Sequence, residues 1–513
     1  MGTGGTTRHD DHADAATESV GPGPVVRTEH GPVRGRALPG GAVAFRGIRY
    51  GAPPTGMLRW RPPEPPAGWS EVRDALEPGP AAWQPAGGPL DGLVPGMAPA
   101  HQGDDCLSLD VWTPGVDDGV RPVLVWIHGG AFSLGAGSLP VYDGARLAAE
   151  HDVVVVTVNY RLGVFGFLHP DDASATPNVG LLDQVAALRW VRDTIAGFGG
   201  DPSNVTVFGE SAGGGSVLSL LAMPSATGLF HRAIVQSGAT DLLLDREAAA
   251  LVVDAVARAA GLTAGDVDGL RTLPAAALLE AQATAAKELF TTVGTMPFHP
   301  CVDGEVLPTS WLDAAARGVN PVPLVIGTTR DEMALFSAMD PRAAALDDAG
   351  LRRRLDRAGH DTDLVVDAYR TVGVVDPPHV WSRVQTDTQM WVPAQRLAEA
   401  HARHAPVWVY RFDRPAADPR LGACHGVDIP FPFGTTDTGG WGDFLGDQRS
   451  ASALSAVVRR LWTAFARHGR PDTESVDWPA HGPDRATLLL DDAVTVVHDP
   501  DAAVRRLWSD PQP

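Results

Sequence analysis

The middle of the chain alternates short hydrophobic runs with segments in which hydrophobic residues recur at helical spacing. Val153–Tyr160 is a nearly continuous run of β-branched residues, a pattern typical of a strand buried on both faces. In residues 181–198, apolar positions recur every three or four residues and stop at Gly199. This alternation predicts an α/β fold with a central, mostly parallel sheet flanked by helices. Further strands are predicted at residues 109–113, 123–127, 205–208, 233–237, 322–326 and 407–412.

The remaining periodic segments lie around and between these strands. Residues 25–35 and 43–50 predict a small antiparallel N-terminal region, and residues 486–490 and 494–497 predict a closing hairpin. Residues 454–465 predict a late amphipathic helix. Two Ala- and Leu-rich blocks at about 245–290 and 340–405 have helical spacing, and we expect them to form helical cap insertions between core strands.

Composition sets the domain organisation and the class of partner. We expect one large domain over residues 25–513, preceded by a disordered tail at residues 1–24, which has neither an apolar core nor paired arginines typical of a signal peptide. The net charge of −21 argues against nucleic acid or an anionic membrane as a partner. No apolar run approaches the roughly 18 residues needed to span a bilayer, so a cytoplasmic location is the default expectation.

The cysteine content also fits a cytoplasmic location. The three cysteines, Cys106, Cys301 and Cys424, are far apart in sequence and form no C-x-x-C pair. We therefore expect neither a metal site nor a disulfide framework, and an odd number of cysteines fits a reducing compartment. No motif calls for a cofactor.

The stretch Gly209-Glu210-Ser211-Ala212-Gly213 carries the clearest chemical signal. It follows the predicted strand 205–208 and precedes a helix, which is the context of a G-x-S-x-G nucleophile elbow. The two glycines permit the strained turn that exposes the serine hydroxyl, and the N–H of Ala212 faces developing negative charge at a helix N-terminus. Short G-x-S-x-G matches also arise by chance in Gly-rich turns, so partners for Ser211 are needed.

A serine nucleophile needs a base that is oriented by a carboxylate, and in proteins built on this elbow the acid and then the histidine follow on later loops. Asp331 and Glu332, just beyond the strand 322–326, are both candidates for the acid, and the residues themselves leave the choice open. Among 17 histidines, His425 follows the strand 407–412 and precedes Gly426. His379, His401 and His404 fall in predicted helical regions and are poorer candidates.

An oxyanion hole would complete such a site. His128-Gly129-Gly130-Ala131-Phe132 follows the strand 123–127 directly, and its glycines allow the chain to fold closely. The N–H groups of Gly130 and Ala131, together with that of Ala212, are therefore predicted to hold a tetrahedral oxyanion.

Together these segments resemble the type B carboxylesterases of the α/β-hydrolase superfamily, and most of all the bacterial p-nitrobenzyl esterase group. The resemblance runs in order from about residue 25 to the C-terminus. The matching segments are Gly47–Pro54, Asp104–Pro114, Trp126–Phe132, Asn159–Gly163, Phe198–Pro202, the elbow, Gly327–Glu332 and His425–Phe431.

The resemblance implies an α/β-hydrolase fold with Ser211 as nucleophile, Glu332 rather than Asp331 as acid, and His425 as base. It also implies that Glu210 contributes to the electrostatics of the site. The sequence departs from the family at one position, because Cys106 matches a half-cystine whose partner position holds Ala82. We therefore expect Cys106 to be a free, buried thiol.

The expected activity is hydrolysis of a small, uncharged carboxylic ester through an acyl-enzyme, by a monomer or homodimer. The alternatives are an acyltransferase or a dedicated hydrolase of a specialised ester, lactone, carbamate or polyester with the same triad, and a non-catalytic binding relative. The pocket walls are predicted to come from Phe132, Glu210, Phe290, Phe431 and Phe433.

Overall fold

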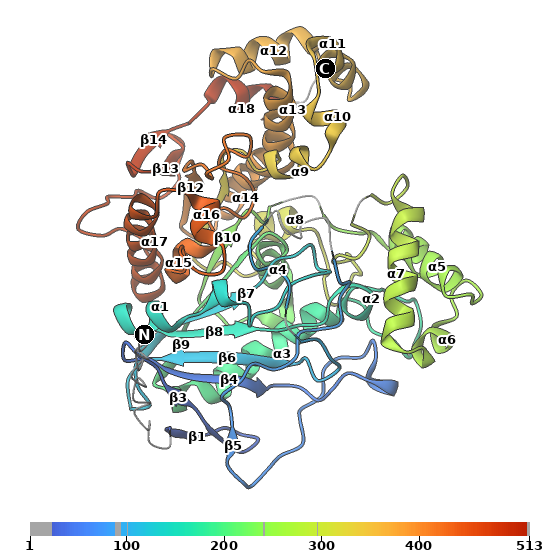
Figure 1. Cartoon of the computed structure of the whole chain (residues 1–513), viewed down its shortest axis with the longest axis vertical. Helices are drawn as coiled ribbons and strands as arrows, with labels where there is room; N and C mark the ends of the chain where they lie inside the picture. Colours follow the sequence, from blue (N-terminus) through green and yellow to red (C-terminus); the bar gives the residue numbers. More distant parts are fainter. Residues whose placement is uncertain (1–22, 88–93, 100, 240–241, 295, 510–513) are drawn as a thin grey trace, which may run out of the picture.

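A twisted sheet covered by helices on both faces forms the centre of the molecule (Figure 1). The computed structural model describes residues 23–87, 94–99, 101–239, 242–294 and 296–509, so most of the predicted N-terminal tail lies outside the described residues. Eleven strands within these ranges form the sheet in the order β14-β13-β12-β11-β10-β9-β7-β8-β6-β4-β3. Their bounds are β3 (Arg36–Ala37), β4 (Val43–Arg49), β6 (Ser108–Thr113), β7 (Arg121–Ile127), β8 (Val154–Val158), β9 (Gly200–Glu210), β10 (Arg232–Gln236), β11 (Leu324–Thr329), β12 (Val407–Phe412), β13 (Ala486–Leu490) and β14 (Thr495–His498).

The sheet is parallel from β8 through β13, and its antiparallel strands lie at the two edges. At one edge β6 pairs antiparallel with β8 and β4, and at the other β13 and β14 form the predicted hairpin. A separate small sheet of β1 (Val25–Arg27), β2 (Pro32–Arg34) and β5 (Arg73–Asp74) begins with an antiparallel pair. The predicted mostly parallel sheet, hairpin and antiparallel N-terminal region are confirmed.

The continuous hydrophobic runs are explained by burial of both faces of the sheet. In β7, Val123, Val125 and Ile127 belong to one hydrophobic cluster, whereas Leu124 and Trp126 belong to another. Successive side chains of a strand point to opposite faces, so each face has its own core. A strand between two cores has no polar side, which is why these runs lack an alternating pattern.

Different helices cover the two faces. The cluster around Val125 includes side chains from α3 (Val179–Thr194), α4 (Ala212–Ala222), α8 (Trp311–Arg317) and α14 (Val392–His401). The cluster around Trp126 includes side chains from α1 (Ala145–His151), α15 (Pro430–Phe433) and α17 (Gln448–His468). The predicted helix at 454–465 is the central part of α17. No helix in the described ranges is long and apolar enough to cross a membrane.

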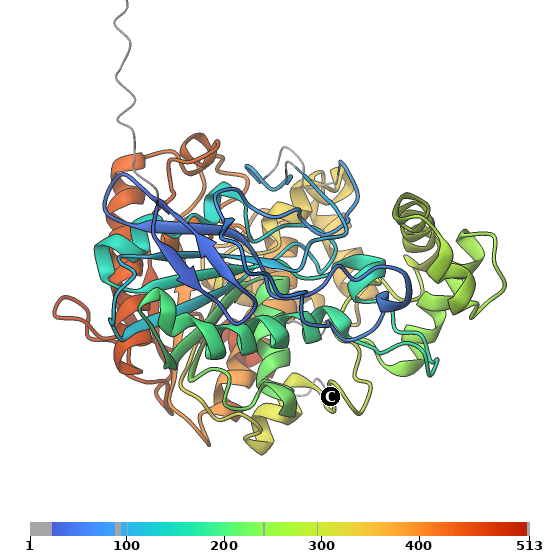
Figure 2. The same cartoon turned by 90° about the horizontal axis from the view of Figure 1, so that it is seen from below.

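The two helical blocks lie in different places. The first consists of α5 (Arg246–Ala259), α6 (Val267–Thr272) and α7 (Ala275–Leu289), which stand at the end of the molecule opposite α17 (Figure 2). The second contains α10 (Pro341–Ala344), α11 (Asp348–Arg357), α12 (Thr362–Thr371) and α13 (Pro377–Thr386). The prediction was wrong at the end of this block, because α14 packs against β12 as part of the layer that covers the sheet.

Candidate active site

Ser211 lies in a sharp turn between β9 and α4, and its φ of 56° and ψ of −123° are strained for a residue with a side chain. The neighbouring glycines are required by close packing. A Cβ added to Gly213 would lie 2.0 Å from the carbonyl oxygen of Ile127, and one added to Gly209 would lie 2.6 Å from Gly213. The N–H of Ser211 donates to the carbonyl of Gln236 on β10 at 2.9 Å. The serine is thus fixed by its hydrogen bond to β10, and the turn that carries it packs against the end of β7.

Two side chains from later loops meet at the serine. The Nε2 atom of His425 lies 2.8 Å from Ser211 Oγ, and its Nδ1 atom lies 2.5 Å from Glu332 Oε2. Glu332 is fully buried, and its other oxygen accepts the N–H of Thr329 at 2.8 Å. Parallel strands bring these loops together, because the loops follow the carboxyl ends of β9, β11 and β12.

The structure separates the two neighbouring candidate acids. Asp331 accepts the N–H of Ala423 at 3.0 Å and donates its own N–H to the Ala423 carbonyl at 2.9 Å. It also pairs with Arg330 at 3.0 Å. Asp331 therefore fastens the loop that carries His425 to the turn that carries Glu332, while Glu332 contacts the imidazole itself.

Buried carboxylates control the charge of His425. Burial lowers the pKa of His425, but the carboxylates of Glu210 and Glu332 outweigh burial and raise it from 6.5 to about 9. Glu210 Oε1 lies 3.4 Å from His425 Nε2. Burial raises the pKa of Glu210 itself from 4.5 to about 8, against the attraction of His425. The site therefore favours the protonated imidazolium, the form that a base reaches after it accepts a proton from a serine.

The predicted oxyanion turn, residues His128–Phe132, passes directly beside Ser211. A Cβ added to Gly129 would lie 3.2 Å from the Cβ of Ser211. Gly130 and Ala131 have φ values of 106° and 54°, and in the described residues their N–H groups have no hydrogen-bond partner. Ala212 is the first residue of α4, so its N–H has no partner within the helix. This arrangement can place three N–H groups around an oxygen atom bonded near Ser211.

The structure places the predicted pocket residues in different environments. Phe132 lies in the oxyanion turn, where its ring packs against Phe167 at 4.9 Å. Phe431 and Phe433 have no exposed surface and belong to the core, so their prediction as pocket walls was wrong. All four residues of the short helix α15 are buried, and the ring of Phe433 packs against Trp126 while that of Phe431 packs against Phe412. Phe290, at the end of α7, is 60% exposed and lies on the surface.

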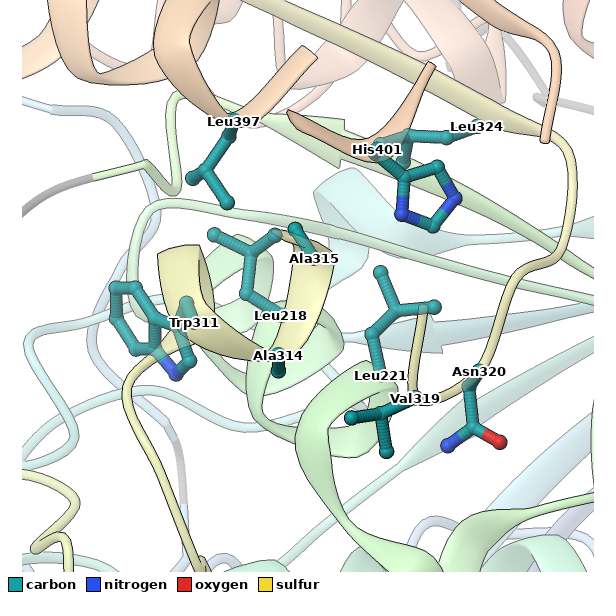
Figure 3. Close-up of a pocket in the computed structure, with 10 residues that line it drawn as sticks. All are labelled: Leu218, Leu221, Trp311, Ala314, Ala315, Val319, Asn320, Leu324, Leu397 and His401. Carbon is teal, nitrogen blue, oxygen red and sulfur yellow. The ribbon is translucent and has the colours of Figure 1, made fainter. Parts of the chain in front are cut away.

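Two cavities lie near the site without including its reacting groups. One, of about 480 Å³, is lined by Arg330 and Asp331 beside Glu332 and by residues of the second helical block, but not by Ser211 or His425. The other, of about 10 Å³, lies behind α4 (Figure 3), lined by Leu218, Leu221, Trp311, Ala314, Ala315, Val319, Asn320, Leu324, Leu397 and His401. It has room for about one water molecule, so it is a packing space and not a substrate pocket.

None of the three cysteines takes part in the hydrogen bonds among Ser211, His425 and Glu332, although Cys424 directly precedes His425. All three are free and buried, and burial raises the pKa of the Cys106 thiol to about 12. Ala82 is buried as well. Within the described ranges, no group of three or more His, Cys, Asp or Glu side chains is placed to hold a metal ion.

Sequence reasoning missed a buried polar group below His425. Asp428 Oδ2 accepts the side-chain N–H of Gln236 at 2.9 Å and the hydroxyl of Tyr410 at 3.3 Å. Burial raises the pKa of Asp428 from 3.8 to about 6. Asp428 stands three residues after His425 in an otherwise apolar segment. An acidic residue in such a segment could have indicated a buried polar group near the histidine.

The chain matches known proteins over nearly its whole length. A model of the carboxylesterase family matches residues 22–502. The chain is 41% identical over 499 residues to para-nitrobenzyl esterase of Bacillus subtilis (strain 168), covering 94% of this chain and 98% of that enzyme. It is 36% identical over 497 residues to phenmedipham hydrolase of Pseudarthrobacter oxydans, covering 94% of this chain and 97% of that one.

A solved structure agrees with these sequence matches. A carboxylesterase of Geobacillus stearothermophilus superimposes with a TM-score of 0.84 at 38% identity, covering 94% of this chain and all of the other, 100%. The similarity therefore includes the sheet, the covering helices and the loops that carry the site.

Proposed function

Because this chain belongs to the carboxylesterase family and is an ester hydrolase with the α/β-hydrolase fold, we propose that Ser211 is its nucleophile, His425 its general base and Glu332 its orienting acid. The observation that carries this proposal is the unbroken line of contacts from Glu332 through His425 to Ser211, with distances of 2.5 and 2.8 Å. Such a line is what a serine needs to lose its proton as it attacks a carbonyl.

The reaction follows from this geometry. His425 takes the proton of Ser211 as Oγ attacks the ester carbonyl, and the N–H groups of Gly130, Ala131 and Ala212 hold the oxyanion. His425 then protonates the leaving alcohol, which leaves an acyl-enzyme, and later takes a proton from the water that hydrolyses it. Glu332 orients the imidazole and, with Glu210, stabilises its charged form.

The proposal is tested with Ser211→Ala and p-nitrophenyl acetate or butyrate. We expect kcat to fall by roughly six orders of magnitude while the circular dichroism spectrum and melting temperature stay unchanged. Ser203→Ala is the matched control, because Ser203 is exposed on the same strand, β9. Undiminished hydrolysis by folded Ser211→Ala would refute the assignment.

For the substrate, we propose an uncharged ester of moderate size. The acidic side chains around His425 support the absence of a negative charge, since Glu210 and Asp428 repel an anionic substrate once they are ionised. A screen over acyl chain length and aryl alcohols tests it, with para-nitrobenzyl esters and phenmedipham included because the relatives carry those names. Partition of the acyl group between water and an added alcohol separates hydrolysis from acyl transfer.

We also propose a cytoplasmic location and a monomeric or homodimeric state. The three free, buried thiols support a reducing compartment. Cell fractionation tests the location, and light scattering of the purified protein tests the assembly.

A further inference from the structure

The oxyanion turn leaves the site through Gly135-Ala136-Gly137, and two buried carboxamides hold this exit. The side chain of Gln84 pairs with Gly135 in both directions. Its Nε2 donates to the Gly135 carbonyl at 2.9 Å, and its Oε1 accepts the Gly135 N–H at 2.8 Å. Nε2 also donates to the carbonyl of Ala82 at 3.0 Å, and the residue is only 3% exposed.

Asn159 makes a similar link two residues further on. Its Oδ1 accepts the N–H of Gly137 at 2.8 Å, and its Nδ2 donates to the carbonyl of Pro80 at 3.2 Å. Asn159 follows β8 and is 4% exposed. Both amides therefore join the exit of the turn to the segment 80–84, and Asn159 is itself anchored at the end of a core strand.

The held exit lies against the start of the turn. A Cβ added to Gly135, whose φ is 102°, would lie 2.8 Å from the Gly129 carbonyl oxygen and 2.6 Å from His128 Nδ1. Between them, the N–H groups of Ser133 and Leu134 both donate to the Gly130 carbonyl, at 3.0 and 2.8 Å. Movement of Gly135 therefore has to move Gly130 as well.

The entrance of the turn is fixed independently. The Tyr160 hydroxyl donates to the His128 carbonyl at 2.8 Å, and the two rings stack at 4.5 Å. The turn itself contains three successive residues in the left-handed region, Gly130, Ala131 and Phe132. Such a backbone persists only where its surroundings hold it.

We propose that Gln84 and Asn159 are positioning residues for ester hydrolysis, which clamp the exit of the oxyanion turn so that the N–H groups of Gly130 and Ala131 point at the reacting oxygen. A carboxamide suits this task because it has a donor and an acceptor in one plane and can pair with a peptide group as a second peptide would. The proposal rests on the oxyanion role given to Gly130 and Ala131 above.

The test is Gln84→Met, which keeps the length of the side chain and removes its hydrogen bonds. We expect kcat for p-nitrophenyl butyrate to fall about 10- to 100-fold, since a displacement of about 1 Å is enough for such a loss, with KM changed less than about threefold. Gln84→Glu keeps an acceptor for the Gly135 N–H but repels its carbonyl, so its kcat should also fall. The burst of p-nitrophenol counts the folded active sites, which removes unfolded protein from the comparison.

A transition-state analogue separates positioning from general damage. A trifluoromethyl ketone forms an oxyanion with Ser211, so its affinity should fall by the same factor as kcat/KM in Gln84→Met. Asp104→Ala is the control, because it removes the contact of Asp104 with Trp83 near the same segment without touching Gly135, and it should leave both values unchanged.

The proposal is overturned if Gln84→Met keeps kcat within twofold of the wild type, or if analogue affinity is unchanged while kcat falls. It is also overturned if Asp104→Ala reproduces the loss. If the assignment of Ser211 as nucleophile were wrong, Ser211→Ala would retain activity, whatever the activity of Gln84→Met. This result is separate from the outcomes that overturn the role of Gln84.

Discussion

Glu210→Gln tests how the buried carboxylates set the basicity of His425. The substitution keeps the shape of the side chain and removes a negative charge 3.4 Å from His425 Nε2. Glu210 is 3% exposed, so water does not replace the lost charge. Since Glu210 and Glu332 raise the pKa of His425 to about 9, removal of one of them lowers it.

The size of the effect follows from Coulomb's law. At 3.4 Å and an effective dielectric constant of about 20, the attraction between the two charges is at most about 5 kcal/mol. Glu210 has its own pKa raised by burial to about 8, so its charge acts fully only at alkaline pH. We therefore expect the pKa of His425 to fall by roughly one to two, and a fall of one corresponds to about 1.4 kcal/mol.

This change in basicity has a definite kinetic signature. His425 must be neutral to accept a proton, so kcat/KM of the wild type should rise with pH and level off above about pH 9. In Glu210→Gln the rise should lie roughly one to two pH units lower. The plateau should fall by about tenfold each time the pKa of His425 falls by one, because the same charge stabilises the imidazolium in the transition state.

The assay is p-nitrophenyl acetate hydrolysis over a pH series from acid to alkaline buffer, after subtraction of the spontaneous rate. Asp428→Asn is the matched control, because Asp428 is also a buried acid but contributes less to the pKa of His425, so its effect should be smaller and in the same direction. The reasoning would be refuted if kcat/KM of Glu210→Gln rose over the same pH range as that of the wild type, or at higher pH.

Two further substitutions test other parts of the site. Glu332→Gln should lower kcat by about 10⁴ because the imidazole loses its orienting carboxylate. Asp331→Asn can still accept the backbone N–H of Ala423, so its kcat should fall less than about tenfold. Equal losses of kcat in the two variants would contradict the division of roles between the two acids. Gly213→Ala should lower the melting temperature strongly because its Cβ would lie 2.0 Å from a backbone oxygen, whereas Gly442→Ala, with no atom nearer than 3.9 Å, should leave melting unchanged. A melting temperature of Gly213→Ala equal to the wild type's would show that the turn tolerates a side chain.

Much of the fold can be predicted from the sequence, because strands buried on both faces are continuous runs of hydrophobic residues. The core strands β7, β8, β9, β11 and β12 all overlap with apolar runs, although β9 begins at Gly200, five residues before the run 205–208. The role of α14 could not be predicted, since a helix on the sheet and a helix in a cap have the same periodicity. Only the partner surface distinguishes them, and that surface comes from a distant part of the chain.

The same limit explains the errors in the predicted pocket. Phe431 and Phe433 follow His425 closely and are apolar, so sequence proximity suggested a pocket wall. In the structure Phe433 packs against Trp126 and Phe208, at 5.1 and 5.6 Å. Proximity in sequence to a reacting residue therefore says little about the direction of a side chain, because a four-residue helix is enough to turn it into the core.

Asp331 and Glu332 show where a local sequence pattern is not sufficient to assign a role. Both follow β11 and both are carboxylates, so their types alone do not separate them, and the resemblance to the carboxylesterases was needed. The structure shows the physical difference, because adjacent side chains leave a turn in different directions. Glu332 is turned inward to His425, and Asp331 is turned toward Ala423 and Arg330. The two carboxylates therefore act together, since Asp331 holds the histidine loop in the place where Glu332 reaches the imidazole at 2.5 Å.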